Sequence, residues 1–156
     1  MAISDLWAAS VPTIRSASGV IYSLVMQSLT RGMLEASQKA ASYTSTAAER
    51  LNSQGLSPDD GPLVIVALCT TWRSAEHDEL VADRVDKLLS DMRELARTRG
   101  LYHRYIFPNY AWPSEPVMAG YGEERLATLR AVAGKWDRDG FFQDRVVGGF
   151  KLNKTD

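Results

Sequence analysis

The chain has 156 residues, of which 45% are hydrophobic and 24% charged, and these values fit a single soluble domain with one core. Its 18 basic and 19 acidic residues leave a formal net charge of -1, so no overall positive field favours binding to nucleic acid. The hydrophobic content and the four tryptophans disfavour a disordered chain. The single cysteine, Cys69, cannot close an intrachain disulfide, which excludes a disulfide-rich scaffold and favours a reducing compartment.

The sequence predicts neither a secretion signal nor a membrane span. No apolar stretch follows Met1, and the first basic residue is Arg15, so the pattern of a signal peptide is not seen. The longest apolar run, from Leu63 to Cys69, is too short to cross a bilayer. We therefore expect a soluble, cytoplasmic protein with no membrane partner.

The first half of the chain is predicted to alternate between helices and strands. In order, we expect a helix over 3–17, a strand over 20–27, a helix over 30–51, a loop over 53–62 and a strand over 63–70. Pro12 makes the first helix start late or kink. The first strand should be half buried, with Tyr22, Leu24 and Met26 on one face. The second strand is an unbroken apolar run, which is typical of a strand covered on both faces.

The second half contains the strongest helical pattern. In order, we expect a helix between Ser74 and Gly100, a strand over 101–107, an irregular loop over 111–122, a helix over 123–136 and a turn-rich tail over 137–151. The long helix has an apolar residue at every third or fourth position: Val81, Val85, Leu88, Met92 and Leu95. Pro108 should end the strand. The tail should dock on the domain through its phenylalanines: Phe141, Phe142 and Phe150.

Common catalytic and metal-binding motifs are missing from the sequence. The two histidines, His77 and His103, lie 26 positions apart and have no partner at metal-ligand spacing, so we expect no metal. No glycine-rich phosphate loop and no Gly-x-Ser-x-Gly elbow occurs. Cys69 lies inside an apolar strand, where a thiol usually packs and does not react.

An unusual stretch of polar and aromatic residues runs from Tyr102 to Trp112. On a strand, alternation would send His103, Tyr105 and Phe107 to one face. One interpretation is an amphipathic strand at the rim of the protein, where tyrosine and arginine are often half exposed. The other interpretation is the wall of a pocket for an apolar, oxygenated small molecule.

Several segments together suggest a family. They are Ser23-Leu24-Val25-Met26-Gln27, Gly61-Pro62-Leu63-Val64-Ile65-Val66, Asn109-Tyr110-Ala111, Tyr121-Gly122-Glu123-Glu124, Leu129-Arg130-Ala131-Val132, Asp137-Arg138-Asp139-Gly140-Phe141-Phe142-Gln143 and Gly148-Gly149-Phe150-Lys151-Leu152. Over residues 19–152 the chain thus resembles the C-terminal end of fungal FAD-linked oxidoreductases, the berberine-bridge-enzyme-like, vanillyl-alcohol-oxidase-type flavoproteins. The alternation of helices and strands by itself favours a parallel α/β sheet. The resemblance implies instead a single α+β domain, a truncated substrate domain in which helices pack on one face of a mostly antiparallel sheet, and we choose this class.

Two departures from the family bear on function. The chain has Trp136-Asp137-Arg138-Asp139-Gly140 where the family usually has Tyr-Asp-Pro-Asp-Gly. The family's flavin domain, with its pyrophosphate loop and FAD-tethering residue, has no counterpart in these 156 residues. We therefore expect no cofactor on this chain, because side chains alone do not transfer hydride. An uncovered substrate domain would expose apolar surface, which predicts a homodimer or a higher oligomer.

Two functions follow from this resemblance. The first is a cofactor-independent cyclase or isomerase of fungal specialised metabolism, which would orient and polarise a reactive small molecule. The second is an accessory module, or part of an FAD-linked oxidoreductase, that completes a flavin site with another chain. The candidate catalytic residues are Tyr105, Asn109, Tyr110 and Arg104 as hydrogen-bond donors and His103 as a proton shuttle. The candidate substrate-binding residues are Tyr22, Met26, Trp72, Phe107 and Trp112.

Overall fold

The computed structural model describes residues 2–41 and 52–153. The chain divides into two compact units, one made of residues 1–27 and 66–103 and the other of residues 28–65 and 104–156. The prediction of a single domain stays a prediction. No helix in the described ranges is both long and apolar enough to cross a membrane.

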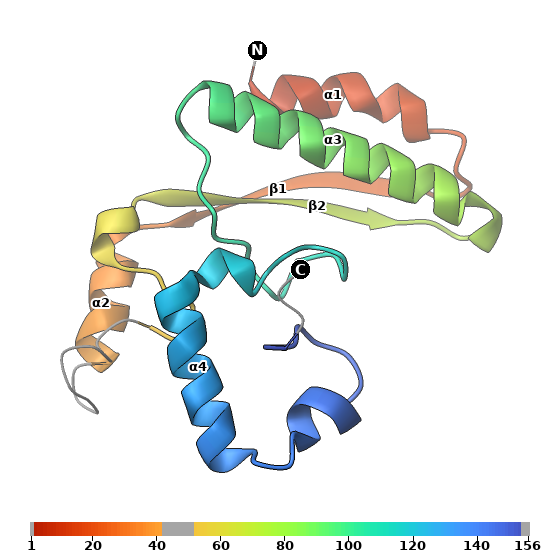
Figure 1. Ribbon diagram of the computed structural model, residues 1–156. Coiled ribbons are helices and arrows are strands. Elements are labelled where there is room, and N and C mark those ends of the chain that lie inside the picture. Colours follow the sequence, from red (N-terminus) through yellow and green to blue (C-terminus); the bar gives the residue numbers. More distant parts are fainter. Residues whose placement is uncertain (1, 42–51, 154–156) are drawn as a thin grey trace. The chain divides into compact units, whose positions relative to one another are not determined.

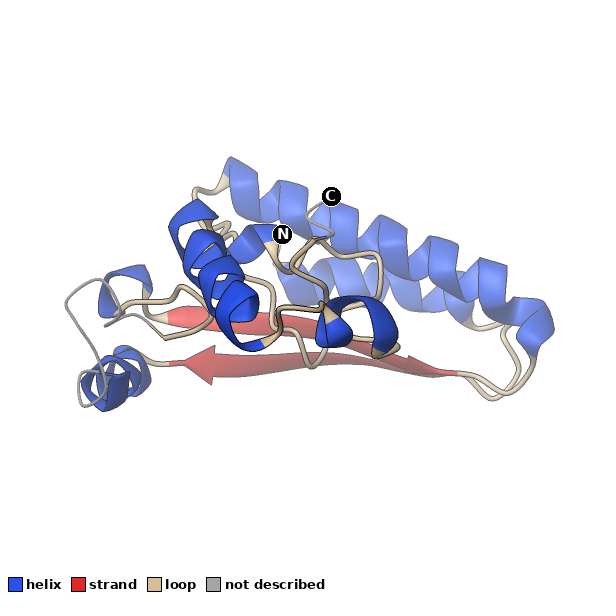
Figure 2. Ribbon diagram, turned by 60° about the horizontal axis from the view of Figure 1, so that its bottom comes forward, coloured by secondary structure: helices blue, strands red, loops and turns tan. Residues whose placement is uncertain are grey.

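In the first unit, two helices cover one face of a two-stranded antiparallel sheet. The strands are β1 (Ile21–Leu29) and β2 (Leu63–Thr71), and they are hydrogen-bonded to each other. The helices α1 (Ile3–Ile14) and α3 (Asp78–Thr98) pack side by side on the same face of this sheet (Figures 1 and 2). The predicted α+β class, with helices packed on one face of an antiparallel sheet, is confirmed.

The core of this unit forms where the apolar stripe of α3 meets α1. Ile14 and Ala17 are buried against Val81. Partly buried side chains surround this cluster: Val20, Tyr22, Trp72 and Val85. Leu88 and Met92 continue the buried stripe along α3, as the three- and four-residue spacing predicted. Pro12 lies inside α1, close to the C-terminal end of that helix.

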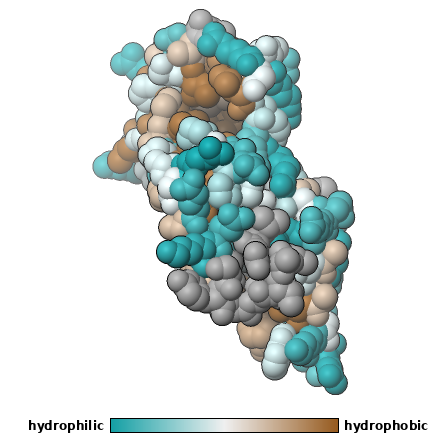
Figure 3. Space-filling view, turned by 90° about the vertical axis from the view of Figure 1, so that its left-hand side faces the viewer, coloured by the Kyte–Doolittle hydropathy of each residue, from teal (hydrophilic) through white to brown (hydrophobic). Residues whose placement is uncertain are grey.

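The prediction that β2 is covered on both faces is wrong. Val64 is 61% exposed, and the thiol-bearing Cys69, predicted to be packed, is exposed as well. Ile21 on β1 is 65% exposed, and apolar side chains reach the surface among hydrophilic ones (Figure 3). The apolar run correctly predicted a strand with an apolar surface. A sequence pattern does not show whether other residues of this chain pack on both faces of that strand.

The second unit is built from short helices. They are α2 (Arg31–Ala41), the 3-10 turns η2 (Pro58–Asp60) and η4 (Ala119–Tyr121), α4 (Glu123–Trp136) and the π-helical turn η5 (Phe141–Arg145). Its buried apolar side chains are Leu34, Leu56, Val117, Tyr121 and Leu126. The predicted helix over 123–136 is confirmed, and so is the helix that begins near residue 30. The predicted continuation of that second helix beyond 41 lies outside the described residues.

The predicted strand over 101–107 is wrong. The chain leaves α3 at Thr98 and forms no regular element between 101 and 107. The side chains of Tyr102 and Tyr105 instead contact Arg97, Gln54 and Tyr121. The strand-like composition misled the prediction, because a strand also needs a neighbouring strand to pair with. The tail prediction holds in part, because Phe150 is half buried whereas Phe141 and Phe142 are exposed and pack edge-on against each other.

The contact between α1 and α3 should carry much of the stability of the first unit. Replacing Ile14, which is 1% exposed, by alanine leaves a cavity against Val81. We expect Ile14→Ala to lower the free energy of unfolding by about 2–5 kcal/mol, measured by urea denaturation. The control Val132→Ala removes a half-exposed side chain from α4 and should change stability far less. Equal losses in the two variants would contradict this core.

Candidate functional site

A group of polar and aromatic side chains meets inside the second unit. We call it the tyrosine-arginine cluster, and its members are Gln54, Arg104, Tyr105, Tyr121 and Arg125. Gln54 precedes η2, Arg104 and Tyr105 lie on the irregular segment after α3, Tyr121 ends η4, and Arg125 lies in the first turn of α4. Segments that are distant in sequence thus supply one site.

Tyr105 is fixed by a hydrogen bond and a ring contact. Its hydroxyl donates to Gln54 Oε1 at 2.7 Å, and its ring stacks on Tyr121 with a centroid separation of 6.4 Å. Gln54 itself is held by an Asx turn, because Asn52 Oδ1 accepts the backbone N–H groups of Gln54 and Leu56 at 3.1 and 3.0 Å. These contacts therefore fix the position of the Tyr105 hydroxyl.

Burial makes both phenols of the cluster weaker acids. It raises the pKa of Tyr105 to about 12, and the neighbouring Tyr121 adds to that effect. Burial also raises the pKa of Tyr121. At neutral pH both side chains are therefore uncharged hydroxyl groups that donate hydrogen bonds, and neither can serve as a general base there.

Arg104 ties two loops together. Its Nη1 donates to the carbonyl of Gly120 at 2.5 Å, and its Nη2 donates to the carbonyl of Gly55 at 3.4 Å. Glycine is required for this close approach. A Cβ on Gly55 would collide with the Tyr121 carbonyl oxygen, and one on Gly122 would lie 2.9 Å from Arg104 Nη1.

Arg125 was not among the residues predicted from sequence. It is only 6% exposed, and its Nε has no hydrogen-bond partner among the described residues. A signal was available, because Arg125 lies four residues before Leu129 and beside Leu126, on the side of α4 expected to face inward. Leu126 is fully buried, whereas Val132, predicted inward as well, is half exposed.

Other predicted site residues of the second unit lie nearer the surface. Phe107 and Tyr110 pack edge-on with centroids 5.0 Å apart, and Asn109 is exposed. Trp112 is exposed and its backbone N–H donates to Glu115 Oε2 at 2.9 Å. The predicted sorting of this stretch onto two strand faces does not apply, because the segment is not a strand.

The remaining predicted residues belong to the first unit. The Tyr22 hydroxyl lies 3.2 Å from Ser10 Oγ, and burial raises its pKa while the hydrogen bond to Ser10 opposes that shift. Trp72 Nε1 donates to Asp78 Oδ1 at 2.6 Å. His103 is half buried and Met26 is exposed. Tyr22 and Trp72 thus pack beside the helical core of this unit.

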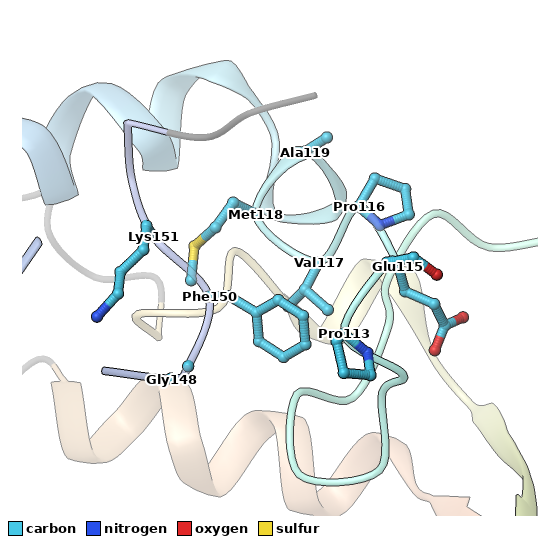
Figure 4. A pocket seen from close by; sticks show the side chains of 11 residues that line it. Pro113, Glu115, Pro116, Val117, Met118, Ala119, Gly148, Phe150 and Lys151 are labelled. Carbon is cyan, nitrogen blue, oxygen red and sulfur yellow. The ribbon is translucent and has the colours of Figure 1, made fainter. Parts of the chain in front are cut away.

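A pocket of about 360 Å³ also lies in the second unit. Residues 113–119 form one wall and residues 148–151 the other. The Phe150 ring points toward Val117 and Pro113 (Figure 4). The Lys151 ammonium group donates to the carbonyls of Phe142 and Val146 at 2.8 and 2.7 Å, which ties the tail to itself. A volume of this size suits a small ligand.

Several fungal proteins named FAD-dependent monooxygenase match this chain. FAD-dependent monooxygenase sdcF of Emericella nidulans is 37% identical over 101 residues, which cover 65% of this chain and 21% of that protein. Oligopeptidase PhomG' of Diaporthe leptostromiformis is 31% identical over 150 residues, or 95% and 12% of the two chains. Bifunctional solanapyrone synthase of Alternaria solani is 28% identical over 93 residues, or 60% and 16%.

The matches cover only part of each relative. It spans less than a quarter of the length of the FAD-dependent monooxygenases that it matches. No family model matches the chain, and no solved structure matches it. Several homologues are thus fungal FAD-dependent monooxygenases, and this chain is similar to a part of those proteins.

The described residues do not fit a complete FAD site. The sequence has no full glycine-rich pyrophosphate fingerprint. The 360 Å³ pocket lies at the small end of the range for drug-sized ligands, and a flavin dinucleotide is larger than such a ligand. Its one lysine, Lys151, already donates to two backbone carbonyls. Any flavin would need groups that these residues do not supply.

The loop contact held by Arg104 gives a first test of the site. We expect Gly55→Ala to lower the free energy of unfolding by roughly 2 kcal/mol or more, since Gly55 has a φ of +74° and a Cβ would strike Tyr121. Gly134→Ala is the matched control, because Gly134 lies inside α4 with open space around it. This control should stabilise the chain by about 0.5–1 kcal/mol. Chemical denaturation of both variants measures the contrast, which a neutral Gly55→Ala would contradict.

The raised pKa of Tyr105 predicts a pH dependence. Between the pKa of an unfolded tyrosine, 10.0, and about 12, the folded chain keeps a proton that the unfolded chain loses. Stability should therefore be intact below pH 10 and fall as the pH rises toward 12. In Tyr105→Phe the fall should be shallower, as measured by denaturation at a series of pH values. Parallel curves for the two proteins would show that Tyr105 titrates like an unfolded tyrosine.

Proposed function

We propose that this chain is the substrate-side part of an FAD-linked oxidoreductase of fungal specialised metabolism, of the berberine-bridge-enzyme-like, vanillyl-alcohol-oxidase type. In this proposal it binds an apolar, oxygenated small molecule, while another polypeptide carries the flavin. The observation that carries the proposal is the alignment of most of this chain with a fraction of several FAD-dependent monooxygenases. When bound, the flavin would supply the redox step that no side chain of this chain can perform.

The unfinished sheet supports the need for a partner. A two-stranded sheet is marginal by itself, and β1 and β2 each have one edge unpaired among the described residues. Exposed apolar residues on these strands, Ile21, Val25, Met26 and Val64, add surface that a partner would bury. We propose the flavin-carrying polypeptide as that partner. The homodimer predicted from the sequence is the other way to cover this surface.

The tyrosine-arginine cluster suits a role in orienting substrate. Tyr121 stays uncharged at neutral pH, so its hydroxyl can donate a hydrogen bond to a carbonyl or hydroxyl oxygen of the substrate. The Tyr105 proton is donated to Gln54, so the oxygen of that hydroxyl can accept a hydrogen bond from a substrate hydroxyl. Asn109 and Tyr110 stay proposed as further contacts in the second unit, and Phe107 and Trp112 stay proposed for substrate binding there. Four residues of the first unit keep only the roles predicted from sequence: His103 as the proton shuttle, and Tyr22, Trp72 and Met26 in substrate binding.

A cofactor-independent cyclase or isomerase is the second candidate function. The observation that favours it is the relative named bifunctional solanapyrone synthase. Such a reaction needs groups that hold two reacting ends together and that stabilise a developing oxyanion, and the neutral hydroxyl of Tyr121 could provide the latter. The two candidates differ in whether the chain acts alone.

A complementation experiment separates the two. The probe is sdcF of Emericella nidulans from which the matched 101-residue segment has been removed, co-expressed with this chain. We expect a co-purifying yellow complex with the absorbance band of bound flavin, while the chain alone stays colourless after incubation with FAD. Light scattering on the same samples counts the copies of the chain. A control co-expression with Ile21→Lys and Val64→Lys should weaken complex formation, because both substitutions charge the exposed apolar surface.

Three outcomes decide the matter. A yellow complex supports the oxidoreductase proposal. No complex, together with turnover of a polyene or quinone-methide substrate by the colourless chain, favours the cyclase. Flavin bound by the chain alone would overturn the assignment of FAD to a second polypeptide.

A further inference from the structure

We propose that the start of α4 is an oxyanion site that binds a carboxylate, or the enolate anion of a comparably acidic enol, of the small-molecule substrate. Arg125 is its principal ligand-binding residue and Arg104 lies beside it. The inference rests on the proposed function only in that the ligand is taken to be the substrate. It concerns binding, so it can be tested without flavin and without turnover.

The first observation is a buried guanidinium that has no anionic partner among the described residues. Arg125 is more than nine-tenths buried, and no described residue accepts a hydrogen bond from its Nε. It takes part in none of the ion pairs formed within the described residues. A buried charge of this kind is costly unless it is paired, and it is rare in folded proteins for that reason. An anionic ligand would remove the cost.

The second observation is the helix end from which Arg125 projects. The 14-residue helix α4 begins directly after Gly122, which has a φ of +85° and no side chain to cap the helix. The first-turn N–H groups of a helix carry partial positive charge and favour anions. Glu123 and Glu124 also lie in this turn, but both are exposed, so solvent screens their repulsion of a ligand.

The third observation is a second guanidinium at the same end. A Cβ on Gly122 would lie within 2.9 Å of Arg104 Nη1, which places Arg104 next to the start of α4. The hydrogen-bond partners of Arg104 are the neutral carbonyls of Gly120 and Gly55. Its positive charge is therefore not neutralised by a carboxylate in these bonds. Arg104 is exposed, so solvent screens its charge as it screens those of Glu123 and Glu124. The buried Arg125 and the helix N-terminus therefore carry the proposal, and Arg104 adds a second cation at the same helix end.

The surroundings narrow the ligand to an unsaturated organic acid. A guanidinium presents a planar fork of N–H groups that matches a carboxylate in two parallel hydrogen bonds. The stacked rings of Tyr105 and Tyr121 lie in the same cluster, and Gly55 packs against both Tyr121 and the Cβ of Arg125. Flat apolar rings favour a flat, conjugated ligand next to the acidic group.

Cinnamate and its neutral amide, cinnamamide, are the probes for this site. They share a flat conjugated body and differ in charge. In the isolated chain labelled with ¹⁵N at arginine, cinnamate should shift the Nε–H signal of Arg125, and cinnamamide should not. Inorganic phosphate is the third probe, and it should bind more weakly than cinnamate if the conjugated body contributes.

Variants assign the binding to Arg125. Titration calorimetry should show cinnamate affinity falling by about ten- to a hundredfold in Arg125→Met, as expected when hydrogen bonds to a charged group are lost. Arg130→Met is the matched control, because Arg130 is exposed on the same helix, and its affinity should equal that of the wild type. Arg125→Met should also fold at least as stably as the wild type, since it removes an unpaired buried charge.

Other results would overturn the proposal. Equal binding of cinnamate and cinnamamide excludes an oxyanion site, and so does wild-type affinity in Arg125→Met. If Arg125→Met does not fold, Arg125→Lys replaces it: this variant keeps the charge but lacks the fork, and unchanged cinnamate affinity there refutes the role of Arg125. Absence of cinnamate binding would refute the oxyanion site without changing the result of the flavin complementation experiment. A colourless co-expression would refute the flavin proposal without changing the result of the cinnamate titration.

Discussion

A sheet of two strands has two edges and two faces, and the helices of this chain cover one face. That constraint governs the first unit, where α1 and α3 bury their apolar stripes on β1 and β2 around Ile14 and Val81. The apolar content of β2 is nevertheless that of a strand covered on both sides. The exposure of Val64 and Ile21 shows this difference between the apolar composition of the strands and the burial that the helices provide.

In the second unit, polar side-chain contacts hold the segments together, a role that the backbone hydrogen bonds of a sheet play in other folds. Arg104 holds the loops at Gly55 and Gly120, and the Asx turn at Asn52 presents Gln54 to Tyr105. Burial raises the pKa of both phenols and keeps them neutral. The bonds of Arg104 hold its guanidinium near the start of α4. The same arrangement explains why the cluster is suited to an oxygenated and acidic ligand, and why it has little capacity for base catalysis.

The sequence predicted an element correctly where its local pattern is compatible with only one type of secondary structure. The stripe through Val81, Leu88 and Met92 predicted α3, and α4 followed from a similar pattern. It failed at 101–107, because a strand exists only if a neighbouring backbone accepts its hydrogen bonds, and composition does not reveal the neighbour. In the tyrosine-arginine cluster, the sequence identified Arg104 and Tyr105 from their residue types. It missed Arg125, whose importance comes from burial without a partner.

The sequence by itself predicted the positions of the main helices, because their periodicity is a property of the chain alone. The α+β class followed from the resemblance to FAD-linked oxidoreductases, which also rests on the sequence alone, and not from periodicity. Only the tertiary structure decided which apolar surfaces are left open and which polar groups meet. Those outcomes depend on contacts between residues far apart in sequence, such as Arg104 with Gly55 and Tyr105 with Gln54. Burial, and with it the raised pKa of Tyr105 and the unpaired charge of Arg125, arises only when such segments come together.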